Sequence, residues 1–586
     1  MRSFHLSVFV LLIMSSTVSA QTPGAQNPTA LPPAPPILSK ALCGAGTFLI
    51  SLSGTSVGRE AFDVKCREDG YSATAQTSIN FPGAAIDVQS QIDVNKNAIP
   101  TSFSSKGKMA TTTVDQKIEF KNGKATITTE NGSQEMLYQD GASFIMSNVP
   151  YLFMFIVARY DVSRSGPQEI ALFPNITITV ERTARDAVQP VGTTAGPTPT
   201  SFDRYTLKLG PTTSVIWADM RGRVAMISVP LQKFVSVRQE YSNFVEPLHS
   251  ALASLIKSLK PDYSVPASAL FTAEEVKIKV KGYVLAGTLL IPKTGAPPFP
   301  VVVTVTGSGQ QTRDEPLPFL NLSEFKPFRQ IAEHLASRGI AVLRVDDRGV
   351  GDSTGIETLE QATTFDFADD VRAQVAYLRT RRELDPKRIA IMGHSEGGII
   401  APLVASSDPQ IAAIVLLAGT AKRGDEVLLY QMNRAIDLNM ALTDEEKIKE
   451  RAKNQKIIRT VLDGGDTSNL PTIFHYKWTK VFLSYDPLAT IKKVRQPIFI
   501  IQGGLDRQVT ADQAGMLAKA AEEAGNTQVM VRIFPDLNHL LLPAKTGEGS
   551  EYSTLEVTSL GDELLRTIGD WLLFKLQRSE PAAPKR

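Results

Sequence analysis

Two patterns of hydrophobic and polar positions divide the chain. From residue 38 to residue 245, short runs of alternating apolar and polar residues are separated by turn pairs such as Asn122-Gly123 and Asn131-Gly132. An alternation with a period of two places one face of a strand in a core, and Asn-Gly between two such runs is a strong hairpin signal. We therefore predict an antiparallel β-rich domain over residues 38–245.

The second pattern occupies residues 265–578, where continuous apolar runs alternate with stretches of helical character. Such runs are typical of parallel strands that are buried on both faces. Strands that alternate with helices predict a mostly parallel, doubly wound sheet, so the fold class expected for this domain is α/β. The predicted strands are 300–306, 340–345, 388–392, 411–417, 496–502 and 529–534.

Residues 421–486 interrupt this alternation. They contain two helical stretches, Val427–Met440 and Asp444–Leu462, and they precede the predicted strand that ends near Asp506. We therefore predict a helical cap inserted into the α/β domain. Ring-bearing side chains gather at its end and either line an apolar pocket or pack the cap on the core: Phe474, His475, Tyr476, Trp478, Phe482 and Tyr485.

The amino terminus has the pattern of a signal peptide over residues 1–20. Met1-Arg2 is followed by an apolar core, Leu6–Met14, and by small residues that end at Ala20. This core is too short to span a bilayer, which needs about 20 apolar residues. No cysteine lies at the junction, which argues against a lipid anchor, and no later stretch predicts a transmembrane helix. We expect an exported protein, either periplasmic or secreted.

Three further segments are expected to lie outside the two domains. Residues 21–37 are rich in proline and predict a flexible leader, because such a composition does not pack into a core. Residues 246–264 are expected to form a helical linker, and residues 579–586 a disordered tail.

Composition and charge fit an exported globular protein. A chain of 586 residues is too long for one compact core, so two or more domains are expected. The net charge of +2, from 62 basic and 60 acidic residues, gives no basis for nucleic-acid binding or for adsorption to an anionic membrane.

The chain has two cysteines, Cys43 and Cys66, and both lie in the β-rich domain on neighbouring predicted strands. In an exported protein this placement favours a disulfide over two buried thiols. No histidine lies between residues 6 and 248, so a metal site in this domain is not expected.

The motif Gly393-His394-Ser395-Glu396-Gly397 carries most of the candidate chemistry. It follows a predicted strand and precedes a small, helix-compatible stretch, which is the context of a nucleophile elbow. Glycines at both ends allow a turn that is too tight for side chains, so the hydroxyl of Ser395 stands clear of the sheet. We therefore predict that Ser395 is a nucleophile rather than an inert serine in a glycine-rich loop.

A serine in such an elbow needs an acid and then a histidine later in the chain. After Ser395 the only histidines are His475 in the predicted cap and His539, which follows the predicted strand 529–534. Asp506 follows the apolar run 496–502 and precedes His539, so these two residues complete the order. Asp536 lies nearer to His539 in sequence, but a separate strand end gives a carboxylate better access to the imidazole Nδ1.

The predicted strand 300–306 ends in Gly307-Ser308-Gly309. Small residues after a strand let backbone N–H groups approach a substrate closely, so we assign the oxyanion-binding donors to the N–H groups of Ser308 and Glu396, with Gly309 as the alternative to Ser308. The glycine-containing segment 346–353 lacks the endings of a phosphate-binding loop, and no nucleotide site or other cofactor is expected.

These motifs together resemble the bacterial α/β-hydrolase superfamily. The resemblance covers about residues 265–578 and rests on five segments: Gly307-Ser308-Gly309, Asp347-Arg348-Gly349-Val350-Gly351, Gly393 to Gly398, Gly503-Gly504-Leu505-Asp506, and His539. Within the superfamily, the chain is most similar to secreted esterases and acyl hydrolases related to serine aminopeptidases. One departure is Thr306-Gly307, where many relatives carry His-Gly.

The resemblance implies a serine hydrolase that acts on small-molecule carboxylic esters without a cofactor. The same three residues would also serve a peptidase or a thioesterase, and those two activities stay open at this stage. A non-catalytic binding protein is the alternative from a different class. The sequence leaves open the acyl length, the alcohol, the role of the β-rich domain and the oligomeric state.

Overall fold

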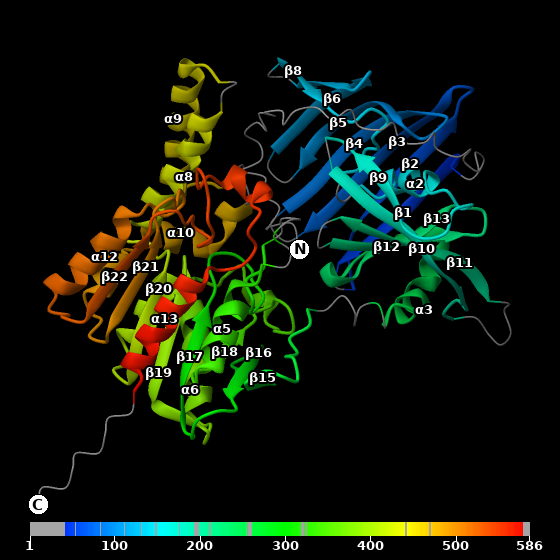
Figure 1. The fold of residues 1–586 in the computed structure, drawn as a ribbon. Coiled ribbons are helices and arrows are strands. Elements are labelled where there is room, and N and C mark those ends of the chain that lie inside the picture. The colour runs from blue at the N-terminus through cyan, green and yellow to red at the C-terminus, as the bar shows by residue number, and fades with distance from the viewer. Residues whose placement is uncertain are drawn as a thin grey trace, which may run out of the picture. The chain divides into compact units, whose positions relative to one another are not determined.

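The computed structural model describes residues 42–577 except for 53, 82–83, 110–111, 130–131, 147–148, 175, 193–198, 210–211, 254, 256–260, 318–321, 323–324, 440–441, 468–469 and 471. The predicted signal peptide 1–20, leader 21–37 and tail 579–586 lie outside these residues. The main division between two compact units falls between Pro261 and Asp262 (Figure 1). Within the described residues, no helix is long and apolar enough to cross a membrane.

The first unit is one antiparallel sheet of 14 strands, as the alternation predicted. Its order is β8-β7-β6-β5-β4-β3-β2-β1-β14-β13-β12-β11-β10-β9, so β1 pairs with β14 in the middle of the sheet. The strands are β1 (Gly44–Leu52), β2 (Thr55–Cys66), β3 (Gly70–Phe81), β4 (Ala84–Asn95), β5 (Pro100–Met109), β6 (Thr112–Lys121), β7 (Lys124–Thr129), β8 (Gly132–Leu137), β9 (Gln168–Leu172), β10 (Ile176–Val188), β11 (Thr200–Leu209), β12 (Thr212–Asp219), β13 (Val224–Val229) and β14 (Phe234–Arg238).

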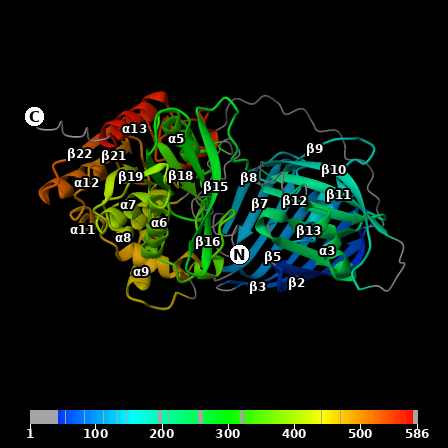
Figure 2. The same ribbon diagram turned by 90° about the horizontal axis from the view of Figure 1, so that it is seen from below.

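The sheet of the first unit is strongly curved (Figure 2). A helix packs into the apolar core on one side of this sheet. This helix, α2 (Leu152–Ala158), was not predicted, and its residues share one core with Phe103 of β5 and Ile216 of β12. At the open end of β1, Cys43 is bonded to Cys66, with their Cα atoms 5.7 Å apart, which confirms the predicted disulfide. The bond joins the start of β1 to the end of β2.

The predicted helical linker is only partly helical where it is described. Helix α3 (Val245–Ser250) covers its start, and Leu248 and Leu252 are fully buried in a cluster with Phe202 and Trp217 of the first unit. This segment therefore belongs to the core of the first unit, because its apolar positions face that sheet rather than solvent.

The second unit is an eight-stranded sheet with the order β15-β16-β18-β17-β19-β20-β21-β22. The first two strand pairs are antiparallel, and every pair from β18-β17 onward is parallel. The strands are β15 (Phe271–Val280), β16 (Tyr283–Pro292), β17 (Phe299–Val305), β18 (Ala341–Val345), β19 (Leu384–His394), β20 (Ile411–Leu417), β21 (Ile498–Gly503) and β22 (Val529–Phe534).

Helices cover both faces of this sheet, as a doubly wound fold requires. Side chains of α6 (Thr364–Arg379), α7 (Gly397–Ala405) and α12 (Asp512–Glu523) share one core with the sheet. Side chains of α5 (Pro327–Ser337) and α13 (Asp562–Lys575) form the core on the other face. The predicted α/β class is therefore confirmed, and the carboxyl ends of β17, β19 and β21 meet at one edge, where open α/β sheets bind their ligands.

The predicted cap lies between β20 and β21 in the chain. It contains α8 (Gly424–Leu438), α9 (Asp444–Leu462) and α10 (Lys477–Ser484), and α11 (Pro487–Ile491) follows its predicted end at residue 486. Helix α9 begins with a capping box. The hydroxyl of Thr443 accepts a hydrogen bond from the N–H of Glu446, and the Glu446 carboxylate accepts one from the N–H of Thr443.

Candidate active site

Ser395 occupies the turn between β19 and α7, and its backbone is left-handed, with φ of 54°. A left-handed conformation is strained for a serine and is typical of functional turns. The neighbouring glycines explain how the turn fits: a Cβ on Gly393 would overlap the carbonyl of Gly397, and one on Gly397 would overlap the carbonyl of Val305. The elbow predicted from the sequence is thus present as a strand, a strained turn and a helix.

Asp506 and His539 are in contact, although 33 residues separate them in the chain. The Nδ1 atom of His539 lies 2.8 Å from Oδ2 of Asp506, and both side chains are buried. The same carboxylate accepts hydrogen bonds from the side chain of Gln502 and from the backbone N–H groups of Gln508 and Val509. Since Nδ1 donates to Asp506, Nε2 of His539 is left to exchange a proton.

Asp536, the competing acid in the sequence, is exposed to solvent. The loop that carries His539 is instead held by Asn538, which is fully buried and accepts hydrogen bonds from the N–H groups of Leu540 and Leu542. An asparagine that organises its own loop leaves a weak sequence signal, and the sequence reasoning missed this residue.

The loop after β17 passes directly beside Ser395. A Cβ built on Gly307 would lie 3.1 Å from Cβ of Ser395. The hydroxyl of Thr306 donates to Asp347, and the N–H of Gly307 donates to Oε1 of Glu315 at 2.7 Å. Since the Gly307 N–H is engaged, Ser308 and Gly309 are the next donors along this loop.

Glu396, which follows Ser395, has a buried carboxylate. Its Oε1 accepts hydrogen bonds from the indole Nε1 of Trp478 and from the hydroxyl of Thr364, each at 2.7 Å. Burial raises the pKa of the Glu396 carboxyl, and hydrogen bonds from Trp478, Thr364 and Ser308 act in the opposite direction. One carboxylate thus joins the cap helix α10 and helix α6 to the elbow and the loop after β17.

The partly buried His394 and the buried Glu315 form a second pair beside the site, and the sequence reasoning assigned neither a role. Nδ1 of His394 lies 2.9 Å from Oε1 of Glu315, and Nε2 lies 3.0 Å from the backbone carbonyl of His539. The segment before Glu315 is fixed by ion pairs of Arg313 with Asp346 and of Asp314 with Arg344, all fully or almost fully buried.

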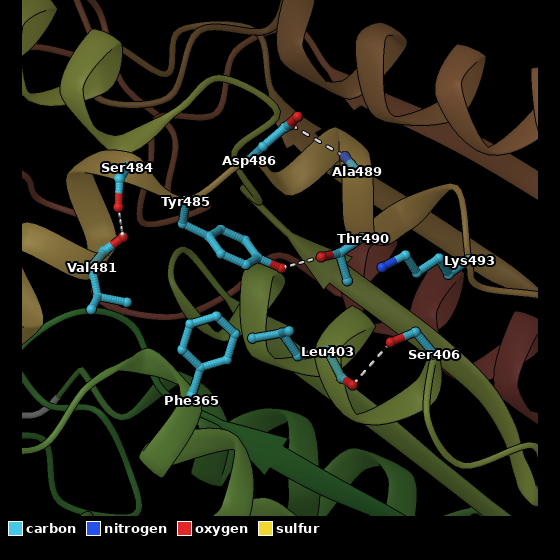
Figure 3. Close-up of a pocket in the computed structure, with 10 residues that line it drawn as sticks. All are labelled: Phe365, Leu403, Ser406, Val481, Ser484, Tyr485, Asp486, Ala489, Thr490 and Lys493. Atoms are coloured by element: carbon cyan, nitrogen blue, oxygen red, sulfur yellow. Dashed lines mark hydrogen bonds between the residues drawn. The ribbon is translucent and has the colours of Figure 1, made fainter.

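One cavity of the second unit has a lining that includes none of these catalytic candidates. It has a volume of about 460 Å³ and is lined by side chains of α6, α7, α10 and α11, with Phe365 and Tyr485 as its aromatic wall (Figure 3). Ser395, Asp506 and His539 are absent from its lining. Of the cap side chains singled out in the sequence, Tyr485 lines this cavity, whereas Trp478 reaches the elbow and stacks on Phe482.

Other roles for these side chains find little support. His475 of the cap bonds the backbone carbonyl of Thr467, which fits a packing role. Within the part of the chain that the structure describes, no cluster of three or more His, Cys, Asp or Glu residues is arranged to hold a metal ion. At the sheet edge the structure brings Asp506 into contact with His539, and Ser395 occupies the strained turn after β19.

Comparison with known proteins agrees with the fold of the second unit. Residues 323–545 match the family model described as serine aminopeptidase, S33. The chain is 30% identical over 318 residues to the esterase EstD of Thermotoga maritima, a match that covers 53% of this chain and 70% of that protein. The chain therefore belongs to the α/β-hydrolase superfamily, in the group of hydrolases that includes this esterase.

Other similarities are more distant. The thiohydrolase apmlB of Arthrinium phaeospermum is 26% identical over 153 residues, which are 26% of this chain and 46% of that protein. Among solved structures, the Pyrococcus furiosus esterase Pf2001 has 17% identity and a TM-score of 0.37, over 54% of this chain and 96% of that one.

Proposed function

We propose that this chain is an exported serine hydrolase, a carboxylesterase, that cleaves esters through Ser395, His539 and Asp506. The observation that carries the proposal is the 2.8 Å contact between Asp506 and His539 at the sheet edge where Ser395 occupies its strained turn. The family relation to esterases supports the reaction class.

The proposed reaction is acyl transfer to water. Nε2 of His539 takes the proton of the Ser395 hydroxyl while Oγ attacks the ester carbonyl carbon. Asp506 holds the imidazole in the tautomer with a proton on Nδ1 and stabilises the imidazolium. The N–H groups of Ser308 and Glu396 bind the oxyanion of the tetrahedral intermediate.

The intermediate then collapses, and the alcohol leaves with the proton that His539 carries. A water molecule attacks the acyl-enzyme, and His539 takes its proton and returns one to Ser395. The products are a carboxylic acid and an alcohol, and no electrons are exchanged. These reaction steps use only residues of the chain and a water molecule.

The nucleophile is tested by Ser395→Ala, which removes one exposed oxygen and leaves the glycines of the elbow unchanged. We expect this variant to lose ester hydrolysis and labelling by a fluorophosphonate probe while it keeps the wild-type circular dichroism spectrum. Labelling of the variant at the wild-type level would show that another residue is the nucleophile. An unlabelled wild-type protein would favour the non-catalytic alternative.

The substrate class is tested with a panel of chromogenic compounds. We expect p-nitrophenyl esters to be cleaved at least tenfold faster, as kcat/KM, than aminoacyl p-nitroanilides of similar size. Amides belong in the panel because the matching family model is described as an aminopeptidase, and thioesters belong there because one relative is a thiohydrolase. Faster cleavage of amides or thioesters would replace the ester assignment.

Export is proposed from residues 1–20, and the disulfide between Cys43 and Cys66 is compatible with it. When the full chain is expressed in a bacterium, we expect the mature protein outside the cytoplasm with its amino terminus at Gln21. Intact-mass measurement of the recovered protein tests this. A cytoplasmic protein that retains Met1–Ala20 would contradict the proposal.

A further inference from the structure

We propose that Glu315 and His394 form a positioning bridge that fixes the loop after β17 relative to the backbone of His539. The inference rests on the proposed ester hydrolysis and adds two residues that act through others rather than on the substrate. Neither residue has a role in the acyl transfer described above.

The bridge has one continuous path of hydrogen bonds. Oε1 of Glu315 accepts from the N–H of Gly307 at 2.7 Å and from Nδ1 of His394 at 2.9 Å, and Nε2 of His394 donates to the carbonyl of His539 at 3.0 Å. One imidazole ring therefore links the loop proposed to bind the oxyanion to the backbone of the proposed general base. His394 also immediately precedes Ser395 in the chain. The loop after β17, the backbone of His539 and Ser395 are therefore all connected to this one residue.

The partners of His394 define its protonation state. A carboxylate oxygen and a peptide carbonyl only accept hydrogen bonds, so both ring nitrogens must carry protons and the side chain is an imidazolium. Burial by itself would lower the pKa of His394, but the Glu315 carboxylate and the carbonyl of His539 outweigh it and raise the pKa to about 9.

The charged groups around His394 come from several elements. Glu315 faces it from the loop after β17, and Asp506 faces it from the turn after β21. His539, on the loop after β22, has its ring centroid 5.0 Å from that of His394. Behind Glu315, Asp347 interacts with the same carboxylate from the end of β18.

Glu315 is buried and His394 is partly buried, and most of their surroundings are apolar. Glu315 and His394 border a cavity of about 30 Å³ whose other lining side chains are apolar, including Leu317, Phe325 and Leu540. An apolar cavity offers few hydrogen-bond partners to a water molecule that might replace a lost donor. Glu315 itself is held in a left-handed backbone conformation, with φ of 53°, as expected for a side chain fixed for a functional purpose.

Loss of the imidazolium proton should loosen the bridge. When one ring nitrogen loses its proton, two acceptors face one another, and either the Gly307 loop or the His539 loop must move. Because the donors to the oxyanion and the general base act in the transition state, kcat should fall. KM for a small ester should stay nearly constant, because neither Glu315 nor His394 contacts the substrate.

The test measures kcat and KM for a short p-nitrophenyl ester from pH 6 to pH 10.5 in the full-length protein. In the wild type we expect kcat to fall with an apparent pKa near 9 while KM changes less than twofold. His394→Gln should lower kcat at pH 7.5 by about 10- to 100-fold and should remove the alkaline fall.

Two further variants make the test specific. Glu315→Gln removes the charge that holds the proton on His394, so the alkaline fall should move to lower pH by about one unit or more. His334→Gln is the matched control, because His334 lies on α5, is half-buried and contacts Arg338 rather than the site. This control should keep the wild-type kcat and pH profile.

The outcomes separate the bridge from the proposed function. If the wild type hydrolyses esters and His394→Gln, correctly folded, keeps kcat within threefold and the same alkaline fall, the bridge is wrong and the triad stands. If His394→Gln does not fold, an unshifted profile in Glu315→Gln is sufficient to reject the bridge. A wild type with neither esterase activity nor Ser395-dependent labelling removes the proposed function and the bridge with it.

Discussion

The carboxylate of Asp506 accepts four hydrogen bonds, so a side chain of different hydrogen-bonding character should not replace it without loss. Its two oxygens accept from His539, Gln502 and two backbone N–H groups. Asp506→Asn would place an amide where only acceptors fit and would remove the charge opposite the imidazolium. We expect a loss of at least about two orders of magnitude in kcat.

Asp536→Asn is the matched variant for this test, because Asp536, like Asp506, precedes His539 in the chain but is exposed. We expect it to lose less than about tenfold in kcat. A larger loss in Asp536→Asn than in Asp506→Asn, with both proteins folded, would assign the acid to Asp536.

A second prediction at the scale of the residue concerns Glu60 in the first unit. Its carboxyl is fully buried, and burial raises its pKa to about 8, while hydrogen bonds from Thr77 and the N–H of Tyr151 oppose the shift. The folded state therefore binds a proton more tightly than the unfolded state, and the free energy of unfolding should fall as pH rises from about 4.5 to 8.

Glu60→Gln should remove this dependence, since the amide keeps an acceptor for Tyr151 and does not titrate. Thermal unfolding of the two proteins at pH 5 and pH 8 provides the measurement. The wild type should lose more stability than the variant between these two pH values, and parallel losses would contradict the assignment.

Among the elements, the cap helix α10 has a polar contact with the elbow. Trp478 donates its indole N–H to the buried Glu396, next to Ser395. Trp478→Phe keeps an aromatic ring but removes the indole N–H donor, which leaves the Glu396 carboxylate with one hydrogen-bond partner fewer. We expect kcat/KM for p-nitrophenyl esters to fall about tenfold.

Tyr485→Phe is the control on the same cap. It also removes one polar atom from an aromatic ring, but its hydroxyl bonds Thr490 at the cavity in Figure 3, away from Ser395. The activity of this variant should stay within about twofold of the wild type. Equal losses in both variants would mean that the cap acts as a whole rather than through Trp478.

Elements with a local signal could be predicted from the sequence. The β6–β7 hairpin follows from Asn122-Gly123, which both adopt positive φ, and α9 follows from the capping pair Thr443 and Glu446. Helix α2 could not be predicted, because Leu152–Ala158 is apolar on all sides and its burial within the curved sheet leaves no period to read.

The same distinction applies to the site. Ser395, Asp506 and His539 each stand in a short motif at a strand end, and the structure brings Asp506 to His539. Glu315 and His394 are 79 residues apart in the chain, and no sequence motif predicts that they are in contact. Only the packing of the loops reveals such a pair.

For the whole molecule, the disulfide and the proposed active site lie in different compact units. The bond between Cys43 and Cys66 closes a loop of the first unit and should contribute about 3 kcal/mol by chain-entropy estimates. Cys43→Ala with Cys66→Ala should therefore lower the unfolding temperature of the first unit. Calorimetry and an ester assay on the same full-length sample test this.

In that experiment we expect ester hydrolysis to remain within about twofold of the wild type at 25 °C, because none of the residues proposed for catalysis lies in the first unit. The single variant Ser395→Ala is the complementary control, with activity lost and stability kept. A double cysteine variant that is stable but inactive would link the first unit to the chemistry.

The position of the cap within the chain has a consequence for how this architecture diversifies. The cap leaves the sheet after β20 and returns at β21, and these two strands are hydrogen-bonded neighbours. Insertions of different length at that point preserve the strand order and the spacing of the turns on either side. Recombination can therefore exchange this one continuous segment while the elbow, the turn that carries Asp506 and the loop that carries His539 are inherited unchanged.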